Sequence, residues 1–196
     1  YKLELLSILK QLVREKQLAV IMSLHEIDLA QKVSDHILCV RHKAIDRYGT
    51  PEEIFSGGYI AALYGITAGT YNETFGFAEL QAAEGPPAVF VIGGGGSGIP
   101  VYRRLQQLGI PFAAGILHQN DMDYPVASML AAQVVSEQPY QPVTEQTLRA
   151  AWDAMDACRY VLCPCRTFGP FNRENEQLRQ RAGSKLCGSP DDLPHG

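Results

Sequence analysis

Long apolar runs are missing from this sequence, although hydrophobic residues make up 46% of its 196 positions. No segment approaches the roughly 18 consecutive apolar residues of a membrane-spanning helix, so none is predicted to cross a membrane. An excess of positive charge is missing too, because the net charge is −4. A nucleic-acid-binding protein usually presents a basic face, so we expect no nucleic-acid partner. The apolar fraction, with only 19% charged residues, predicts a globular chain with a real core.

A disulfide framework is also absent. The five cysteines are odd in number and unevenly spaced, unlike those of a small secreted domain. We therefore expect a reducing, cytoplasmic setting. No signal peptide opens the chain, Tyr1 is not a start methionine, and a helical pattern already runs at residue 2. These features predict that the sequence is part of a longer protein.

The first third of the chain has the pattern of an α/β protein. Leucines at helical spacing occupy residues 3–12, and Leu18–Leu24 is a short apolar run typical of a strand buried on both faces. We expect a short helix over Glu26–Val33 and a second strand over His36–Val40. A further helix should begin at Thr50, because Thr is a good N-cap and Pro51 suits the first helical turn.

Residues 1–66 resemble the C-terminal part of the nucleotide-binding subunit of ABC transporters. The matching features are a helix, then LAVIMSLHEIDLAQKVSDHILCV, then GTPEEIF. In that family the histidine of S-x-H-[DE]-x-x-x-A contacts the ATP γ-phosphate, and the resemblance assigns this switch role to His25. Within this family, the resemblance is strongest to importers of iron-siderophores, haem or cobalamin. It implies ATP and Mg²⁺ as cofactors of a longer parent, transmembrane permease subunits as partners, and a location at the inner face of the cell membrane.

The other parts of such an ATP site are absent. No G-x-x-x-x-G-K-[ST] loop occurs, because the glycine run ending at Gly98 is followed by Ile99 and Pro100. The phosphate-binding lysine and the magnesium-binding hydroxyl are therefore missing. The sequence also has no signature loop and no hydrophobic run ending in Asp-Glu. We predict that this chain alone does not hydrolyse ATP.

A change of character separates the first part from a second domain. Residues 67–87 are rich in Gly, Thr and Pro and are predicted to be a linker, within which Thr70–Leu80 has strand-like composition. Residues 88–187 then alternate apolar strands with helices, and residues 188–196 form a tail. The expected strands cover 88–92, 110–117 and 160–163, and the expected helices cover 99–108, 125–136, the segment after Thr144, and 172–181. This alternation predicts a small Rossmann-like domain with a parallel sheet.

A glycine-rich loop gives the second domain its clearest motif. It matches G-x-G-x-x-G between a predicted strand and a predicted helix, and its residues are Gly93, Gly94, Gly95, Gly96, Ser97 and Gly98. Glycines let a backbone approach an anion, and the helix start presents free N–H groups. A phosphate or nucleotide-like ligand, another anionic ligand, and a tight packing turn with no ligand all remain open.

Three loops should meet at one edge of this sheet, because parallel strands share a carboxyl edge. The second loop carries His118 and Asp121, and the third carries Arg166. With the glycine-rich loop they make up the predicted ligand-binding set, in which Arg166 pairs with an anion. No metal is expected. Cys163 and Cys165, with His118 opposite, are retained as an alternative soft-metal site.

We therefore expect an α/β chain that combines a fragment of an ABC ATPase domain with a Rossmann-like domain. The leading hypothesis is that the second domain binds a small anionic or nucleotide-like ligand and regulates transport. A nucleotide-dependent enzyme domain and a structural module that joins two copies into a homodimer are the alternatives. The cofactor of the second domain, if it has one, is left unassigned.

Overall fold

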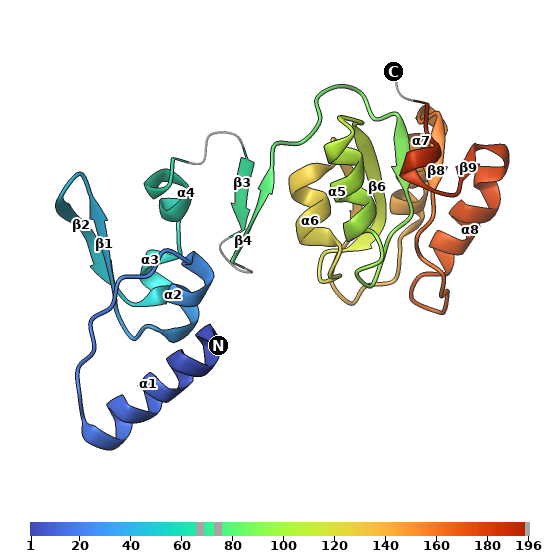
Figure 1. Ribbon diagram of the computed structural model, residues 1–196. Coiled ribbons are helices and arrows are strands. Elements are labelled where there is room, and N and C mark those ends of the chain that lie inside the picture. The colour runs from blue at the N-terminus through green and yellow to red at the C-terminus, as the bar shows by residue number, and fades with distance from the viewer. Residues whose placement is uncertain (66–68, 73–75, 195–196) are drawn as a thin grey trace. The chain divides into compact units, whose positions relative to one another are not determined.

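The computed structural model describes residues 1–65, 69–72 and 76–194 (Figure 1). The chain divides into two compact units. Unit 1 comprises residues 1–67 and 71–78, and unit 2 comprises residues 68–70 and 79–196. Each unit is described by itself. In the described part of the chain, no helix has both the length and the apolar character needed to cross a membrane.

The described residues of unit 1 form four helices, an antiparallel hairpin and a small core. The helices are α1 (Lys2–Lys16), α2 (Ile27–Val33), α3 (Pro51–Ile54) and α4 (Tyr59–Leu63), and the strands are β1 (Ile37–Arg41) and β2 (Ala44–Gly49). His42 and Lys43 turn the hairpin with φ of 48° and 67°, the left-handed conformation that two-residue hairpin turns require. The core contains Cys39, Ile54, Phe55 and Ile60.

The helix predicted at Thr50 is confirmed. Its side chain accepts a hydrogen bond from the Glu53 amide at 3.4 Å, and the Glu53 carboxylate accepts one from the Thr50 amide at 2.9 Å. This reciprocal pair satisfies two backbone donors at the helix start. The helix over Glu26–Val33 and the strand over His36–Val40 are also present, as α2 and β1.

The predicted strand over Leu18–Leu24 is wrong. This stretch has no regular secondary structure, and Leu18, Val20 and Ile21 are exposed. A strand exists only through hydrogen bonds to a neighbouring strand, and among the described residues β1 pairs with β2. An apolar run without a strand beside it therefore stays unpaired.

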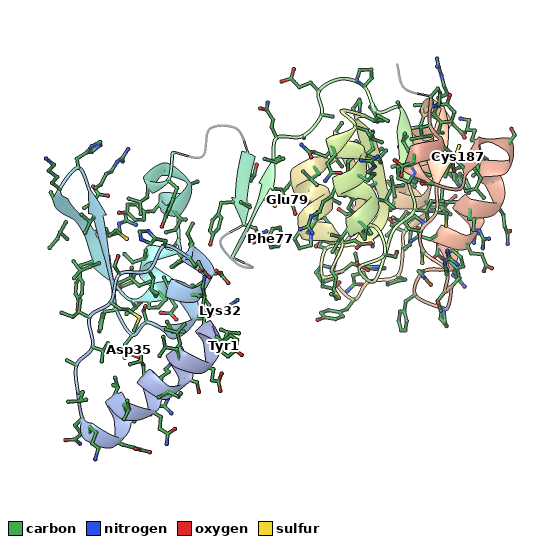
Figure 2. All side chains as sticks on the ribbon, viewed as in Figure 1. Tyr1, Lys32, Asp35, Phe77, Glu79 and Cys187 are labelled. Carbon is green, nitrogen blue, oxygen red and sulfur yellow. The ribbon has the colours of Figure 1, made fainter. Side chains whose placement is uncertain are left out.

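Two strands follow within the predicted linker. β3 (Gly69–Asn72) and β4 (Phe77–Leu80) form a two-stranded sheet. Residues 73–75 of the strand-like stretch lie outside the described part. In unit 2 Glu79, labelled in Figure 2, accepts a hydrogen bond from Arg103 Nε at 2.9 Å.

Unit 2 is a parallel five-stranded sheet with helices on both faces, so the predicted α/β fold class is confirmed. Its strands are β5 (Val89–Val91), β6 (Phe112–His118), β7 (Gln133–Glu137), β8 (Tyr160–Leu162) and β9 (Leu186–Cys187). Its helices are α5 (Ile99–Gln107), α6 (Tyr124–Leu130), α7 (Glu145–Ala157) and α8 (Arg173–Ala182). The spatial order is β7-β6-β5-β8-β9, with the first strand in the centre as in doubly wound folds.

The core of unit 2 explains this layering. α7 and α8 contribute Ala151, Met155 and Leu178 to a cluster with Phe90 and Val161 of the sheet. Figure 1 shows α5 and α6 on the opposite face. Strand side chains alternate between faces, so a sheet covered on both sides needs apolar residues at successive positions. The fully buried strand Val89–Val91 meets this need.

The local structure of unit 2 differs in three places from what the sequence pattern indicates. The helix expected over 125–136 ends at Leu130. Gln133–Glu137, which contains the β-branched Val134 and Val135, forms β7 beside β6. Cys187 lies on β9 (Figure 2), a short strand that the sequence did not predict. Asn172 is of a type that often caps helices, but it precedes α8 without capping it. Its side chain instead accepts from the Gly169 amide at 2.7 Å and donates to the Thr167 carbonyl at 3.0 Å.

Candidate functional site

A cavity of about 590 Å³ opens at the carboxyl edge of the unit 2 sheet. Its walls come from the loops after β5, β6 and β8 and from the first turn of α8. The strand order reverses between β5 and β8, so the loops after these strands run to opposite faces and leave space between them. The three loops predicted to meet therefore line one cavity, of a size usual for a small-molecule site.

The glycine-rich loop is held by two carboxylates of the same chain. The Asp123 Oδ2 atom accepts hydrogen bonds from the amides of Gly94 at 2.5 Å and Gly98 at 2.9 Å. The Gly95 amide donates to both oxygens of Asp121, at 3.1 and 3.0 Å. The donors that the sequence predicts around an external anion thus bond here to carboxylates that follow β6. That this loop binds a ligand stays a prediction.

Close packing explains why two of these positions are glycine. A Cβ atom on Gly98 would lie 2.3 Å from the Tyr102 hydroxyl and 2.8 Å from Asp123 Oδ2. A Cβ on Gly93 would meet the same two atoms at the same distances. Real Cβ contacts are not that short, so the backbone of the loop approaches these side chains only because glycine has no side chain.

The carboxylate below the loop is fully buried. Burial raises the pKa of Asp123, the amide donors of Gly98 and Gly94 oppose the rise, and the negative charge of Asp121 adds to it. Its Oδ1 atom and the Tyr102 hydroxyl are buried without a hydrogen-bond partner in the described structure. Burial, and then the charges of Asp123 and Asp121, raise the pKa of Tyr102 far above its usual range, so its hydroxyl stays protonated.

The loop after β8 supplies the positive charge of the cavity. Arg166 is exposed, lines the cavity, and forms no hydrogen bond or ion pair with any residue that the structure describes. Its guanidinium carries five N–H donors in a fork suited to carboxylate or phosphate. Beside it Cys165 is buried, and its thiol lies 3.4 Å from the Thr167 carbonyl. Of the predicted set, Arg166 is the unpaired cation on the cavity wall.

His118 lines the cavity at the end of β6. Its Nε2 atom lies 2.8 Å from the Gln141 carbonyl oxygen. A carbonyl only accepts, so Nε2 carries the hydrogen and Nδ1 of the neutral ring is an acceptor. The neighbouring Glu137 on β7 bonds the amides of Thr144 and Gln138, which, with Thr147, lower its pKa to about 2. Glu137 thus stays charged and holds the start of α7.

Asn175 and Glu174 are among the wall residues that the sequence did not predict. Asn175 Oδ1 accepts from the Ile116 amide at 2.9 Å, and its Nδ2 donates to the Ile116 carbonyl at 3.0 Å. The Asn175 side chain thus satisfies the backbone groups of Ile116 at the point where the β6–β7 register is interrupted, between Ala114 and Leu117. Glu174 is 8% exposed, lines the same cavity, and pairs with Arg173 at 2.8 Å. The only sequence signal for either was a position in the first turn of a helix at the sheet edge.

The alternative metal ligands do not form a cluster. Within the ranges that the structure describes, no group of three or more His, Cys, Asp or Glu side chains is arranged to hold a metal ion. Burial, and then the proximity of Cys165, raise the pKa of the Cys163 thiol to about 11. A thiol must lose its proton to bind metal, so this environment works against Cys163 as a ligand.

His25 lies in unit 1, whereas every residue that lines the cavity belongs to unit 2. It is exposed in the irregular segment before α2. The residues of this chain do not fit a complete ATP–Mg²⁺ site, because the sequence has no lysine-bearing phosphate loop and the described residues hold no metal cluster. The switch role of His25 stays a prediction.

The geometry defines an α/β protein with a ligand-sized cavity at the carboxyl edge of a parallel sheet. The model of the MJ0874 family matches residues 112–187, from the start of β6 to the end of β9. The chain is 34% identical over 108 residues to an uncharacterized ABC transporter ATP-binding protein, MJ0873, of Methanocaldococcus jannaschii, covering 54% of this chain and 37% of the relative.

A second relative covers more of the chain. The cobalamin import ATP-binding protein BtuD of Halobacterium salinarum is 24% identical over 169 residues, which is 83% of this chain and 42% of the relative. These relatives of the chain are ABC transporter ATP-binding proteins. The chain spans about two fifths of the length of the curated relatives it matches.

Proposed function

We propose that this chain is the C-terminal part of an ABC transporter ATP-binding subunit, and that unit 2 is a ligand-binding domain that regulates transport. The names of the relatives support the first part. The longer protein binds ATP and Mg²⁺, works with transmembrane permease subunits at the inner face of the membrane, and forms a homodimer. The Halobacterium relative supports cobalamin as a cargo, within the iron-siderophore, haem and cobalamin group.

The observation that carries the second part is the cavity with the unpaired Arg166 on its wall. A cation held at a concave site without a counter-ion favours a ligand that brings negative charge. Around it the cavity offers the glycine-rich loop, Asp121 and His118, so a small anionic or nucleotide-like ligand matches the chemistry of the walls.

Calorimetry on the whole 196-residue chain tests ligand binding. The panel contains inorganic phosphate, nucleoside mono-, di- and triphosphates, and small dicarboxylates. We expect at least one to bind, and Arg166→Ala to weaken it by about ten- to a hundred-fold, as expected for the loss of a charged hydrogen bond. If no anion binds the folded protein, unit 2 is a structural module and the proposed function is wrong.

Regulation is measured in the longer protein. A bound ligand regulates only if it has different affinities for two states of the transporter. Its addition should therefore change the ATP hydrolysis rate, and Arg166→Ala should remove that change. A rate that is unaffected by a saturating ligand would contradict the regulatory role.

A further inference from the structure

The walls of the unit 2 cavity show which groups a ligand must carry. This inference rests on the proposed function and concerns the same site. Its starting point is that the amides of Gly94, Gly95 and Gly98 already donate to Asp123 and Asp121. An anion that bonded to these three amides would have to displace a carboxylate and then lie beside it.

Asp121 gives this side of the cavity its hydrogen-bond acceptors. Its Oδ1 atom accepts from the amides of Gly95 and Asp123, and its Oδ2 atom accepts from Gly95. A carboxylate has about four lone-pair sites, so Oδ2 keeps capacity for a donor from the half-buried cavity wall. In the neutral form of the ring, His118 Nδ1 is a second acceptor on this wall, because Nε2 donates to the Gln141 carbonyl. Hydroxyl groups are the ligand groups that match.

Arg166 gives the other side of the cavity its hydrogen-bond donors. It lies on the loop after β8, whereas Asp121 lies on the loop after β6, and β5 separates these strands. Glu174 on the cavity wall is paired with Arg173, so it is not the counter-ion of Arg166. A dianionic phosphate fits the guanidinium fork with two parallel hydrogen bonds and brings more negative charge than a single carboxylate.

We infer that the cavity takes a phosphomonoester that bears neighbouring hydroxyl groups, with its phosphate on Arg166 and its hydroxyls on Asp121. Sugar phosphates and nucleoside monophosphates share this chemistry. The cavity of about 590 Å³ has room for either. Phe171, 87% exposed on the wall, offers a ring face for the base of a nucleotide.

The test is calorimetry on the whole chain with inorganic phosphate, ribose, ribose 5-phosphate and AMP. Arg166→Gln is compared with Arg159→Gln, an exposed arginine before β8 at the opposite edge of the sheet. Asp121→Asn is compared with Asp191→Asn, an exposed carboxylate paired with Arg104. Melting curves verify that each variant is folded.

We expect Arg166→Gln to weaken inorganic phosphate, ribose 5-phosphate and AMP alike, by about ten- to a hundred-fold. Asp121→Asn should weaken ribose 5-phosphate and AMP about ten-fold and leave inorganic phosphate unchanged. Both control variants should bind as the unmodified chain does. Tighter binding of AMP than of ribose 5-phosphate identifies a nucleotide, and the reverse identifies a sugar phosphate.

The opposite pattern overturns the inference. If Asp121→Asn strengthens phosphate binding and Arg166→Gln has no effect, the anion binds at the glycine-rich loop, and the proposed ligand-binding function still stands. If only dicarboxylates of the wider panel bind, the inference fails and the function survives. If nothing in either panel binds, both are wrong.

Discussion

At the residue scale, the Tyr102 hydroxyl lies so close to the glycine-rich loop that one added methyl group at Gly98 would clash with it. The side chain is fully buried and stacks on Phe112 with a centroid distance of 5.2 Å. It has no room to withdraw from a larger residue at Gly98, because a tightly packed interior relaxes only partly. The loop is therefore shaped by packing as well as by hydrogen bonds.

Gly98→Ala should destabilise unit 2 by about 1–3 kcal/mol, the usual cost of overpacking. The added methyl would overlap the Tyr102 ring and crowd Asp123. The measurement is chemical denaturation followed by tryptophan fluorescence, since Trp152 is the only tryptophan and packs on the unit 2 core. Gly169→Ala is the matched control, because a Cβ there meets nothing within 4 Å. Equal stability of the two variants would contradict the packing explanation.

At the scale of elements, the start of α7 depends on β7. Thr144 caps the helix as predicted, accepting from the Thr147 amide at 3.2 Å. The sequence did not indicate that Glu137 would bond both the Thr144 amide and the Thr147 hydroxyl. A carboxylate from one element thus satisfies donors of the next, which adds polar bonds to the apolar core that β7 and α7 share.

The lowered pKa of Glu137 predicts how the stability of the fold depends on pH. Its folded pKa of about 2 lies below the ordinary 4.5, so its contribution is full above about pH 4.5 and is lost as the pH falls toward 2. Glu137→Gln should lower the free energy of unfolding by about 1–3 kcal/mol at neutral pH, and much less near pH 2. Denaturation midpoints over this pH range provide the measurement. Glu145→Gln, in the exposed pair with Arg149, is the control. An unchanged difference at all pH values would exclude this role.

At the scale of the whole molecule, two units carry different parts of the inferred function. Unit 1 holds His25, which the resemblance links to ATP, and unit 2 holds the cavity. Neither contains a lysine-bearing phosphate loop, since that motif does not occur in the sequence. Without this loop the β- and γ-phosphates lose their main backbone cradle and the lysine that reaches them.

We therefore expect this chain to show no ATP hydrolysis. Phosphate release with ATP and Mg²⁺ should equal that of a blank, and His25→Ala should leave it unchanged. A chain boiled before the assay gives the baseline. Turnover above this baseline that His25→Ala abolishes would show that the chain holds a working site after all.

Local signals in the sequence were sufficient for much of the fold. Thr50 and Thr144 marked two helix starts, and the alternation of apolar runs with amphipathic segments predicted a parallel sheet. The topology rule then brought the glycine-rich loop, His118 and Arg166 to one cavity. These inferences succeeded because capping, periodicity and the shared carboxyl edge depend on residues close in sequence or on chain direction.

Only the tertiary structure decided the rest. The apolar run Leu18–Leu24 does not become a strand without a neighbouring strand, whereas Gln133–Glu137 becomes β7 because β6 lies beside it. Asp123 reaches Gly94 and Gly98 across more than twenty residues of sequence. A hydrogen bond between distant segments leaves no periodic trace in the sequence. The bonds from the glycine-rich loop to Asp121 and Asp123 were therefore visible only in the folded chain, where the two loops lie together.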